Sequence, residues 1–138
     1  MKALNILLVD DNVSFRKAFK MLLEKQFHAN IIGEASSAED FLKLNLLSTV
    51  DIIFMDIILP DGDGISLARE CLRFNNQIKI IALTMYPEIV YQETLIESGF
   101  VGCIFKNELF KELSIALEIV LNNNNYFPKS IYINKKEE

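Results

Sequence analysis

The feature that most constrains the fold is a set of five short apolar runs spread along the chain. They cover residues 4–9, 30–35, 51–55, 79–84 and 101–105. All but the second are almost continuously apolar, which is typical of strands buried on both faces of a parallel sheet. The sequence therefore predicts five parallel strands.

Segments with helical spacing follow each run. In the first, apolar residues recur three or four positions apart and form one stripe, made of Phe15, Phe19, Leu22, Leu23 and Phe27. The later segments are 36–47, 63–74, 88–98 and 109–121. Ser36 followed by Glu39 resembles a capping box at the start of the second helix. Gly99 suits the position just after the fourth helix, and the four asparagines 122–125 end the fifth.

Strands and helices therefore alternate five times. This order predicts an α/β fold with a parallel sheet and helices on both faces. The length of 138 residues fits one domain.

Composition excludes several classes of protein. The net charge is −5, which argues against a general nucleic-acid surface. No signal peptide is evident, and no apolar stretch reaches the about 18 residues that span a bilayer, so we expect a cytoplasmic protein without membrane segments. Cys71 and Cys103 lie in apolar runs and are expected to be buried thiols, not a disulfide or a metal pair. The single histidine, His28, is not expected to be catalytic or to bind zinc.

Polar residues follow four of the predicted strands. Asp10 and Asp11 follow the first, Asp56 the third, and Lys106 the fifth, while Thr84 closes the fourth. Ligands of open parallel sheets bind outside the carboxyl ends of the strands. These five side chains are therefore expected to converge at one edge.

This set of residues suits phosphoryl transfer. Three neighbouring carboxylates repel one another, and a Mg²⁺ ion removes the conflict while binding phosphoryl oxygens. A lysine and a hydroxyl can hold the phosphoryl group, since such transfer depends on positioning and charge neutralisation. Asp56 stands alone between apolar residues and is the candidate nucleophile, which would form an aspartyl-phosphate.

The chain resembles the receiver domain of two-component response regulators. The resemblance covers residues 4–121 and rests on four motifs: "ILLVDDN" (6–12), "FMDIILPDGDG" (54–64), "ALT" (82–84) and "IFK" (104–106). "LTMYPE" (83–88) and the Lys-Asn pair at 106–107 are similar to the NarL/FixJ-type subfamily.

The resemblance implies a flavodoxin-like, doubly wound sheet with strand order 2-1-3-4-5. It implies a phosphorylation-controlled switch, not an enzyme beyond its own Mg²⁺-dependent phosphotransfer and dephosphorylation. Asp56 would accept the phosphoryl group from a sensor histidine kinase or phosphotransfer protein. Lys106 would contact that group, and Thr84 would move to bind it. The implied Mg²⁺ ligands are Asp10, Asp11, Asp56 and the backbone carbonyl of Ile58.

The resemblance also implies an output domain or downstream protein as partner, and a possible homodimer. Members of this subfamily usually carry a DNA-binding domain after the receiver, which is not among these residues, so the sequence fits either a stand-alone receiver or a piece of a longer regulator. The negative charge and the lack of a basic helix argue against direct nucleic-acid binding. We expect a receiver at residues 1–122 and a tail or linker start at 123–138.

Three positions depart from the family pattern. Cys103 stands where an aromatic switch residue is common, Asn107 where a proline often follows the lysine, and Met85 where a small residue usually follows the threonine. These departures leave open a degenerate receiver that acts as a phosphorylation-independent interaction module.

Other interpretations of the acids fit less well. A metal-dependent phosphatase with an aspartate nucleophile would need Asp-x-Asp after the first strand, where this chain has Asp10, Asp11 and Asn12. A calcium loop from Asp61 would need oxygen ligands where Ile65 and Leu72 stand.

Overall fold

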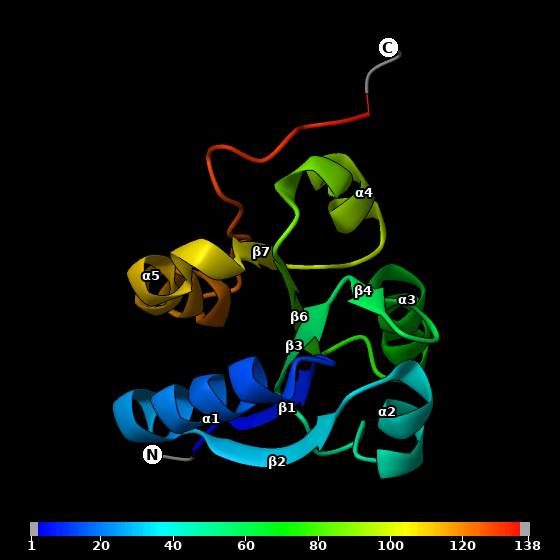
Figure 1. The fold of residues 1–138 in the computed structure, drawn as a ribbon, viewed down its shortest axis with the longest axis vertical. Helices are drawn as coiled ribbons and strands as arrows, with labels where there is room; N and C mark the ends of the chain where they lie inside the picture. Colours follow the sequence, from blue (N-terminus) through cyan, green and yellow to red (C-terminus); the bar gives the residue numbers. More distant parts are fainter. Residues whose placement is uncertain (1–2, 136–138) are drawn as a thin grey trace.

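A computed structural model describes residues 3–135. At its centre is a parallel sheet in the order β2-β1-β3-β6-β7 (Figure 1). The strands are β1 (Asn5–Val9), β2 (Asn30–Ala35), β3 (Ile52–Asp56), β6 (Lys79–Thr84) and β7 (Gly102–Phe105). Counted within this sheet alone, the order is 2-1-3-4-5, so the predicted doubly wound α/β fold is confirmed.

Helices cover both faces of the sheet. In Figure 1, α1 (Val13–Phe27) and α5 (Leu109–Leu121) lie on one side. On the other lie α2 (Ala38–Leu44), α3 (Gly64–Phe74) and α4 (Gln92–Glu97). Alternate residues of each strand enter opposite cores: Ile6 and Leu8 pack with the α1–α5 cluster, whereas Leu7 and Val9 pack with the other. Two buried faces explain why β1, β3, β6 and β7 are almost continuously apolar, whereas β2, at the edge of the sheet, is only partly buried.

A small hairpin follows β3. It consists of β4 (Ile58–Leu59) and β5 (Gly62–Asp63), which pair antiparallel and were not expected from the sequence. It brings α3 against the end of β3, where the Gly64 N–H donates to the Ile57 carbonyl at 2.7 Å. A Cβ on Gly64 would lie 2.1 Å from the carbonyl oxygen of Asp56, so only glycine fits there.

Two predicted helix starts are wrong. The N-cap of α2 is Ser37, whose hydroxyl accepts from the Asp40 N–H at 3.0 Å, whereas the Ser36 hydroxyl accepts from Arg16. The fourth helix does not begin at residue 88. A 3₁₀ turn, η1 (Pro87–Ile89), and two extended residues precede α4. Its end is as predicted, because Gly99 has φ 96° just after the C-cap.

Beyond α5, residues 126–133 turn back along β7 and α4 (Figure 1). We call this segment the strap. Cys71 and Cys103 are buried free thiols, and burial raises the pKa of each to about 12. Within residues 3–135, no helix has the length and apolar character needed to cross a membrane.

Candidate functional site

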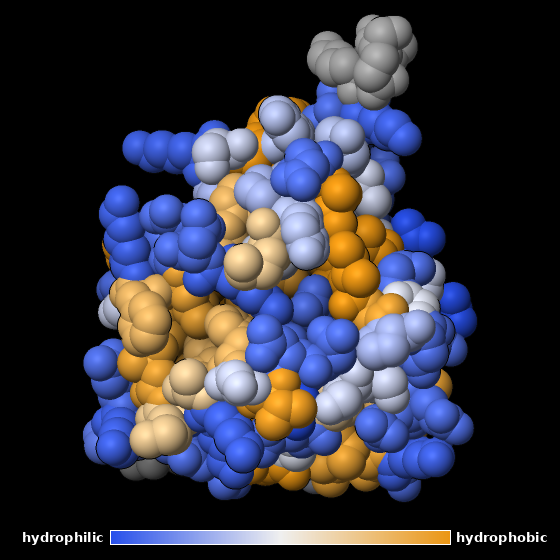
Figure 2. Space-filling view, in the orientation of Figure 1, coloured by the Kyte–Doolittle hydropathy of each residue, from blue (hydrophilic) through white to orange (hydrophobic). Residues whose placement is uncertain are grey.

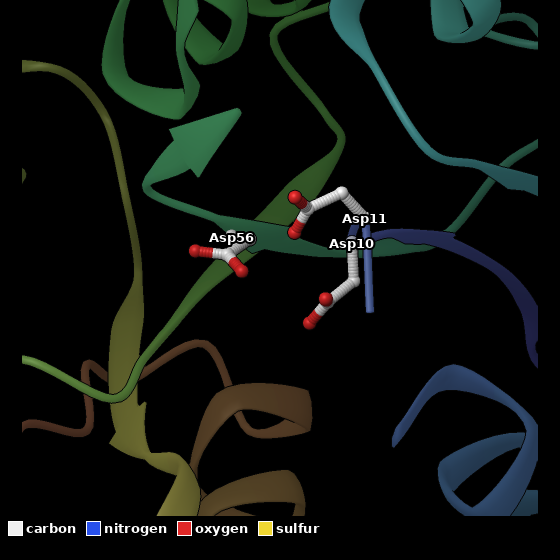
Figure 3. Close-up of side chains that lie close together, drawn as sticks. All are labelled: Asp10, Asp11 and Asp56. Atoms are coloured by element: carbon white, nitrogen blue, oxygen red, sulfur yellow. The ribbon is translucent and has the colours of Figure 1, made fainter. Parts of the chain in front are cut away.

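Three carboxylates meet at the carboxyl ends of β1 and β3. Asp10 directly follows β1, Asp11 comes next, and Asp56 is the last residue of β3. One carboxylate oxygen of each lies within 4.8 Å of the others (Figure 3). Asp10 and Asp56 are buried, and Asp11 is exposed. The sheet therefore brings together the acids that the sequence predicted to converge.

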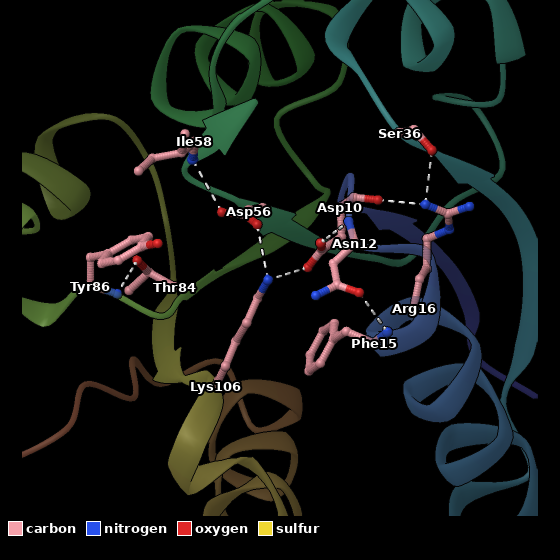
Figure 4. Close-up of polar contacts among 10 residues, drawn as sticks. All are labelled: Asp10, Asn12, Phe15, Arg16, Ser36, Asp56, Ile58, Thr84, Tyr86 and Lys106. Carbon is pink, nitrogen blue, oxygen red and sulfur yellow. Dashed lines mark hydrogen bonds and ion pairs between the residues drawn. The ribbon is translucent and has the colours of Figure 1, made fainter. Parts of the chain in front are cut away.

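Lys106 supplies a buried positive charge to this cluster. It begins η2 (Lys106–Glu108), directly after β7. Its Nζ lies 2.6 Å from Asp10 Oδ2 and donates to Asp56 Oδ2 at 3.0 Å (Figure 4). Burial alone would lower the pKa of Lys106, but Asp10 and Asp56 outweigh it and raise that pKa. The lysine is therefore a cation fixed at the centre of the site.

Asp56 experiences opposing influences. Burial raises its pKa, and the charge of Asp10 raises it further. The Lys106 contact and the Ile58 N–H, which donates to Asp56 Oδ1 at 3.1 Å, act in the other direction. The net effect is a raised pKa, because the carboxylate is largely removed from water.

The donor set fits a hard divalent cation. Asp10 Oδ2 is buried, and Lys106 Nζ, 2.6 Å away, is its charged neighbour. Three carboxylates against one ammonium leave a negative charge that a cation such as Mg²⁺ would offset. Ile58, predicted to add a carbonyl ligand, lies beside Asp56 on β4.

Thr84 is buried at the end of β6, next to Leu83, the strand partner of Asp56. Its hydroxyl accepts from the Tyr86 N–H at 3.0 Å (Figure 4). No hydrogen bond joins it to Asp56 or Lys106 in the described part of the chain. Of the five predicted side chains, four are thus in one cluster and the fifth faces the adjoining loop.

Sequence reasoning missed two residues that support the site. Lys106 Nζ lies 4.5 Å from the centroid of the Phe15 ring, a cation–π distance. Arg16 donates to the Asp10 carbonyl and to the Ser36 hydroxyl, and its Nε donates to Glu34 at 2.9 Å. The sequence indicated only that Phe15 belongs to an apolar stripe, and no sequence motif indicated a role for Arg16 at the site.

Asn12 explains why Phe15 lies there. Its side chain caps α1 by accepting from the Phe15 N–H at 3.0 Å, and its own N–H donates to Asp10 Oδ1 at 2.8 Å. The acidic loop and the start of α1 therefore form one unit.

Arg16 in turn ties the end of β1 to β2. Burial raises the pKa of Glu34, but hydrogen bonds and charges from Arg16 and Lys20 lower it overall.

Figure 2 shows hydrophilic surface near the middle of the molecule, where β1 and β3 end, with more hydrophobic surface over α1 and α5 beside it.

Comparison with known proteins agrees with this geometry. Residues 6–118 match the family model described as the response regulator receiver domain. Response regulator UvrY from Escherichia coli (strain K12) is 30% identical over 128 residues, which is 93% of this chain and 59% of that protein. The chain thus spans about 59% of the length of the curated relatives it matches.

Solved structures show the same fold. A LuxR-family two-component response regulator from Aurantimonas sp. SI85-9A1 has a TM-score of 0.82 and 26% identity, over 94% of this chain and 93% of that one. The non-phosphorylated receiver domain of Escherichia coli RcsB has a TM-score of 0.79 at 22% identity, over 93% of this chain and 100% of that one. The predicted resemblance, including its NarL/FixJ-like character, is confirmed. The chain belongs to the family of response regulator receiver domains, which are signalling proteins.

Proposed function

We propose that this receiver is a switch controlled by phosphorylation of Asp56. The observation that carries the proposal is the position of that carboxylate: it is buried at the end of β3, 3.0 Å from Lys106 Nζ and in a cluster with two further acids. A sensor histidine kinase or a phosphotransfer protein would supply the phosphoryl group.

The transfer step needs little besides position and charge. A carboxylate oxygen of Asp56 attacks phosphorus as the bond from phosphorus to the donor's leaving atom breaks, and the leaving atom keeps the electron pair. Lys106 stabilises negative charge on the phosphoryl oxygens, since its Nζ already lies at the attacking group. It also favours the ionised, nucleophilic form of Asp56.

Asp10, Asp11 and Asp56, with the backbone carbonyl of Ile58, would hold Mg²⁺. The bound ion would neutralise phosphoryl oxygens during transfer. The grouping of three carboxylate oxygens within 4.8 Å of one another supports this assignment.

Thr84 would respond to the negative charge of the phosphoryl group on Asp56. Its hydroxyl would turn from Tyr86 toward the phosphoryl group, and the loop after β6 would follow. Cys103, buried on β7, offers no aromatic ring to couple to this motion. The loop itself would therefore carry the change.

The wider assignments are proposals too. We assign residues 1–122 to the receiver and 123–138 to a tail or linker start, and place the protein in the cytoplasm. Its partners would be a kinase, an output domain or downstream protein, and a possible second copy of the chain, with no direct contact to nucleic acid. Catalysis would be limited to its own phosphorylation and dephosphorylation.

Intact mass after incubation with Mg²⁺ and acetyl phosphate tests the proposal. We expect one phosphoryl adduct on wild type and none on Asp56→Asn. Asp63→Asn is the matched control, because asparagine can also cap α3, and it should form the adduct like wild type. No adduct on any of the three would favour the degenerate interaction module, and an adduct on Asp56→Asn would place the phosphoryl group on another residue.

A further inference from the structure

The strap is docked at both of its ends. At its start, the Tyr126 N–H donates to the Val101 carbonyl at 2.9 Å, and the Cys103 N–H donates to the Tyr126 carbonyl at 2.9 Å. Further along, Ile131 is 5% exposed and packs into the core on the α2–α3 face. The strap therefore extends the β7 edge of the sheet and then crosses to α4 (Figure 1).

At α4, the strap supplies the acceptors that the helix start lacks. The Gln92 N–H donates to the Tyr132 carbonyl at 2.8 Å, and the Glu93 N–H donates to the Ile133 carbonyl at 2.7 Å. The N-cap residue, Tyr91, makes no side-chain capping bond. Since the first N–H groups of a helix need external acceptors, the strap caps α4.

The same two N–H groups would be used differently in a longer helix. Val90 and Tyr91 are extended, with φ/ψ of −116°/142° and −128°/133°, and they separate η1 from α4. In a helix running from Pro87, the Gln92 and Glu93 N–H groups would donate to the carbonyls four residues earlier, at positions 88 and 89. They cannot serve both sets of acceptors fully, so a capped short α4 and a long α4 exclude each other.

The sequence supports the longer helix. Residues 88–98 have helical spacing, which is why the helix was predicted to begin there. Pro87 already occupies the first position of η1, and proline at the first position favours a helix start. Local sequence preference is therefore compatible with a longer α4, whereas the strap contacts and the buried side chain of Val90 hold the shorter one.

The loop that would rearrange is next to the phosphorylation site. Tyr86, the residue before η1, is held by the Thr84 hydroxyl. A cavity of about 560 Å³ separates Pro87 from strap residues that include Tyr126 and Tyr132. Reorientation of Thr84 would free the Tyr86 N–H, and the next residue, Pro87, borders this cavity.

We propose that the strap and α4 form a two-state switch: in one state the strap is docked and α4 is short, and in the other the strap is released and α4 runs from Pro87. Phosphorylation of Asp56 shifts the population toward the released state by freeing Tyr86. This trigger rests on the proposed function, whereas the mutual exclusion does not. Phosphorylation of Asp56 would thereby determine whether the strap is docked or released.

Ile131→Asp tests the exclusion without phosphorylation, by placing a charge in the core under the strap. Ile133→Asp is the matched control, because that side chain is 60% exposed. We would measure backbone chemical shifts and amide exchange by NMR. For Ile131→Asp we expect fast exchange in the strap, helical shifts at residues 88–91, and continued protection of Gln92 and Glu93, whose N–H groups change partner. Ile133→Asp should match wild type.

Simple undocking gives a different result. If the strap exchanges fast while Val90 and Tyr91 stay extended and the Gln92 and Glu93 amides lose protection, the inference is wrong.

A second pair of variants leaves the core untouched. Tyr91→Ala and Tyr91→Thr both remove the ring that lies 6.1 Å from that of Tyr132, but alanine favours a helix roughly threefold over threonine. The strap should be released about threefold more often in Tyr91→Ala. Equal strap protection in the two variants would overturn the exclusion.

The trigger is tested on wild type with Mg²⁺ and acetyl phosphate, with the adduct monitored by mass. The adduct should produce the same shifts as Ile131→Asp. If the adduct forms and the strap stays protected, the trigger fails and the proposed function stands. If no adduct forms, the proposed function and the trigger fail together. The Ile131 and Ile133 variants and the Tyr91 variants still test whether a docked strap and a long α4 exclude each other.

Discussion

The Nζ atom of Lys106 lies 3.0 Å from Asp56 Oδ2, although the two residues are 50 positions apart in the chain. The lysine also contacts Asp10 at 2.6 Å, so one buried cation serves two buried carboxylates. The residues proposed for chemistry thus also contribute to stability, and their replacement has consequences that can be measured without a phosphodonor.

Lys106→Met should destabilise the protein by about 3 kcal/mol, because it leaves two buried carboxylates without their counter-charge. Urea unfolding at neutral pH, in the absence of divalent cations, measures the change. Lys111→Met is the control. That side chain is 80% exposed, and its removal should change stability by less than about 0.5 kcal/mol. Equal effects would contradict a structural role for the Lys106 contacts.

Asp56→Asn should raise the melting temperature at pH 7 in the presence of a chelator. The folded protein raises the pKa of Asp56 above 3.8, so it binds a proton there more tightly than the unfolded chain does. The favourable contribution of Asp56 is therefore present below pH 3.8 and is lost as the pH rises through the folded-state pKa. Melting curves between pH 3.5 and pH 7 should show the advantage of Asp56→Asn growing with pH. A constant difference would contradict the raised pKa.

Mg²⁺ should stabilise wild type by about 2.7 kcal/mol at a concentration one hundred times its dissociation constant. Asp11→Asn should lose most of that gain at the same concentration, since it removes one of the three clustered carboxylates. Asp40→Asn, which changes an exposed acid on α2, should keep it. Thermal unfolding by circular dichroism with and without Mg²⁺ makes the comparison, and an equal gain in both variants would place the ion elsewhere.

Gly64→Ala should lower stability by about 1–3 kcal/mol and slow phosphorylation, because its Cβ would lie 2.1 Å from the Asp56 carbonyl oxygen. Gly62→Ala, two residues earlier, is the control, since its Cβ would meet nothing within 4 Å. Denaturant unfolding separates the two. If Gly64→Ala leaves the stability unchanged, the hairpin can shift to accommodate the new Cβ without displacing β3.

The sheet could be predicted because every strand except β2 is buried on both faces, so that its apolar pattern is local to the strand. The clustering of Asp10, Asp56 and Lys106 followed from the topology, since the carboxyl ends of parallel strands share an edge. The distances between these residues did not follow from the topology, because they depend on the conformation of the long Lys106 side chain.

The two helix starts that were predicted wrongly depend on contacts between residues far apart in the chain. Two adjacent serines could each cap α2, and Arg16 takes the hydroxyl of Ser36, which leaves Ser37 for the helix. The predicted start of α4 was wrong, and at the observed start the amides of Gln92 and Glu93 donate to strap carbonyls 40 residues later in the chain. The contact of the Thr84 hydroxyl with the Tyr86 N–H is local, but it involves a residue outside the "ALT" motif.

In the proposed switch, Asp56 itself carries the phosphoryl group. Borohydride reduces an aspartyl-phosphate to homoserine, so peptide mass mapping after acetyl phosphate, Mg²⁺ and borohydride identifies the residue. We expect homoserine at position 56 in wild type, and none there when Mg²⁺ is withheld. Homoserine at position 10 or 11, or an unmodified peptide 54–64 beside a phosphorylated peptide elsewhere, would contradict it.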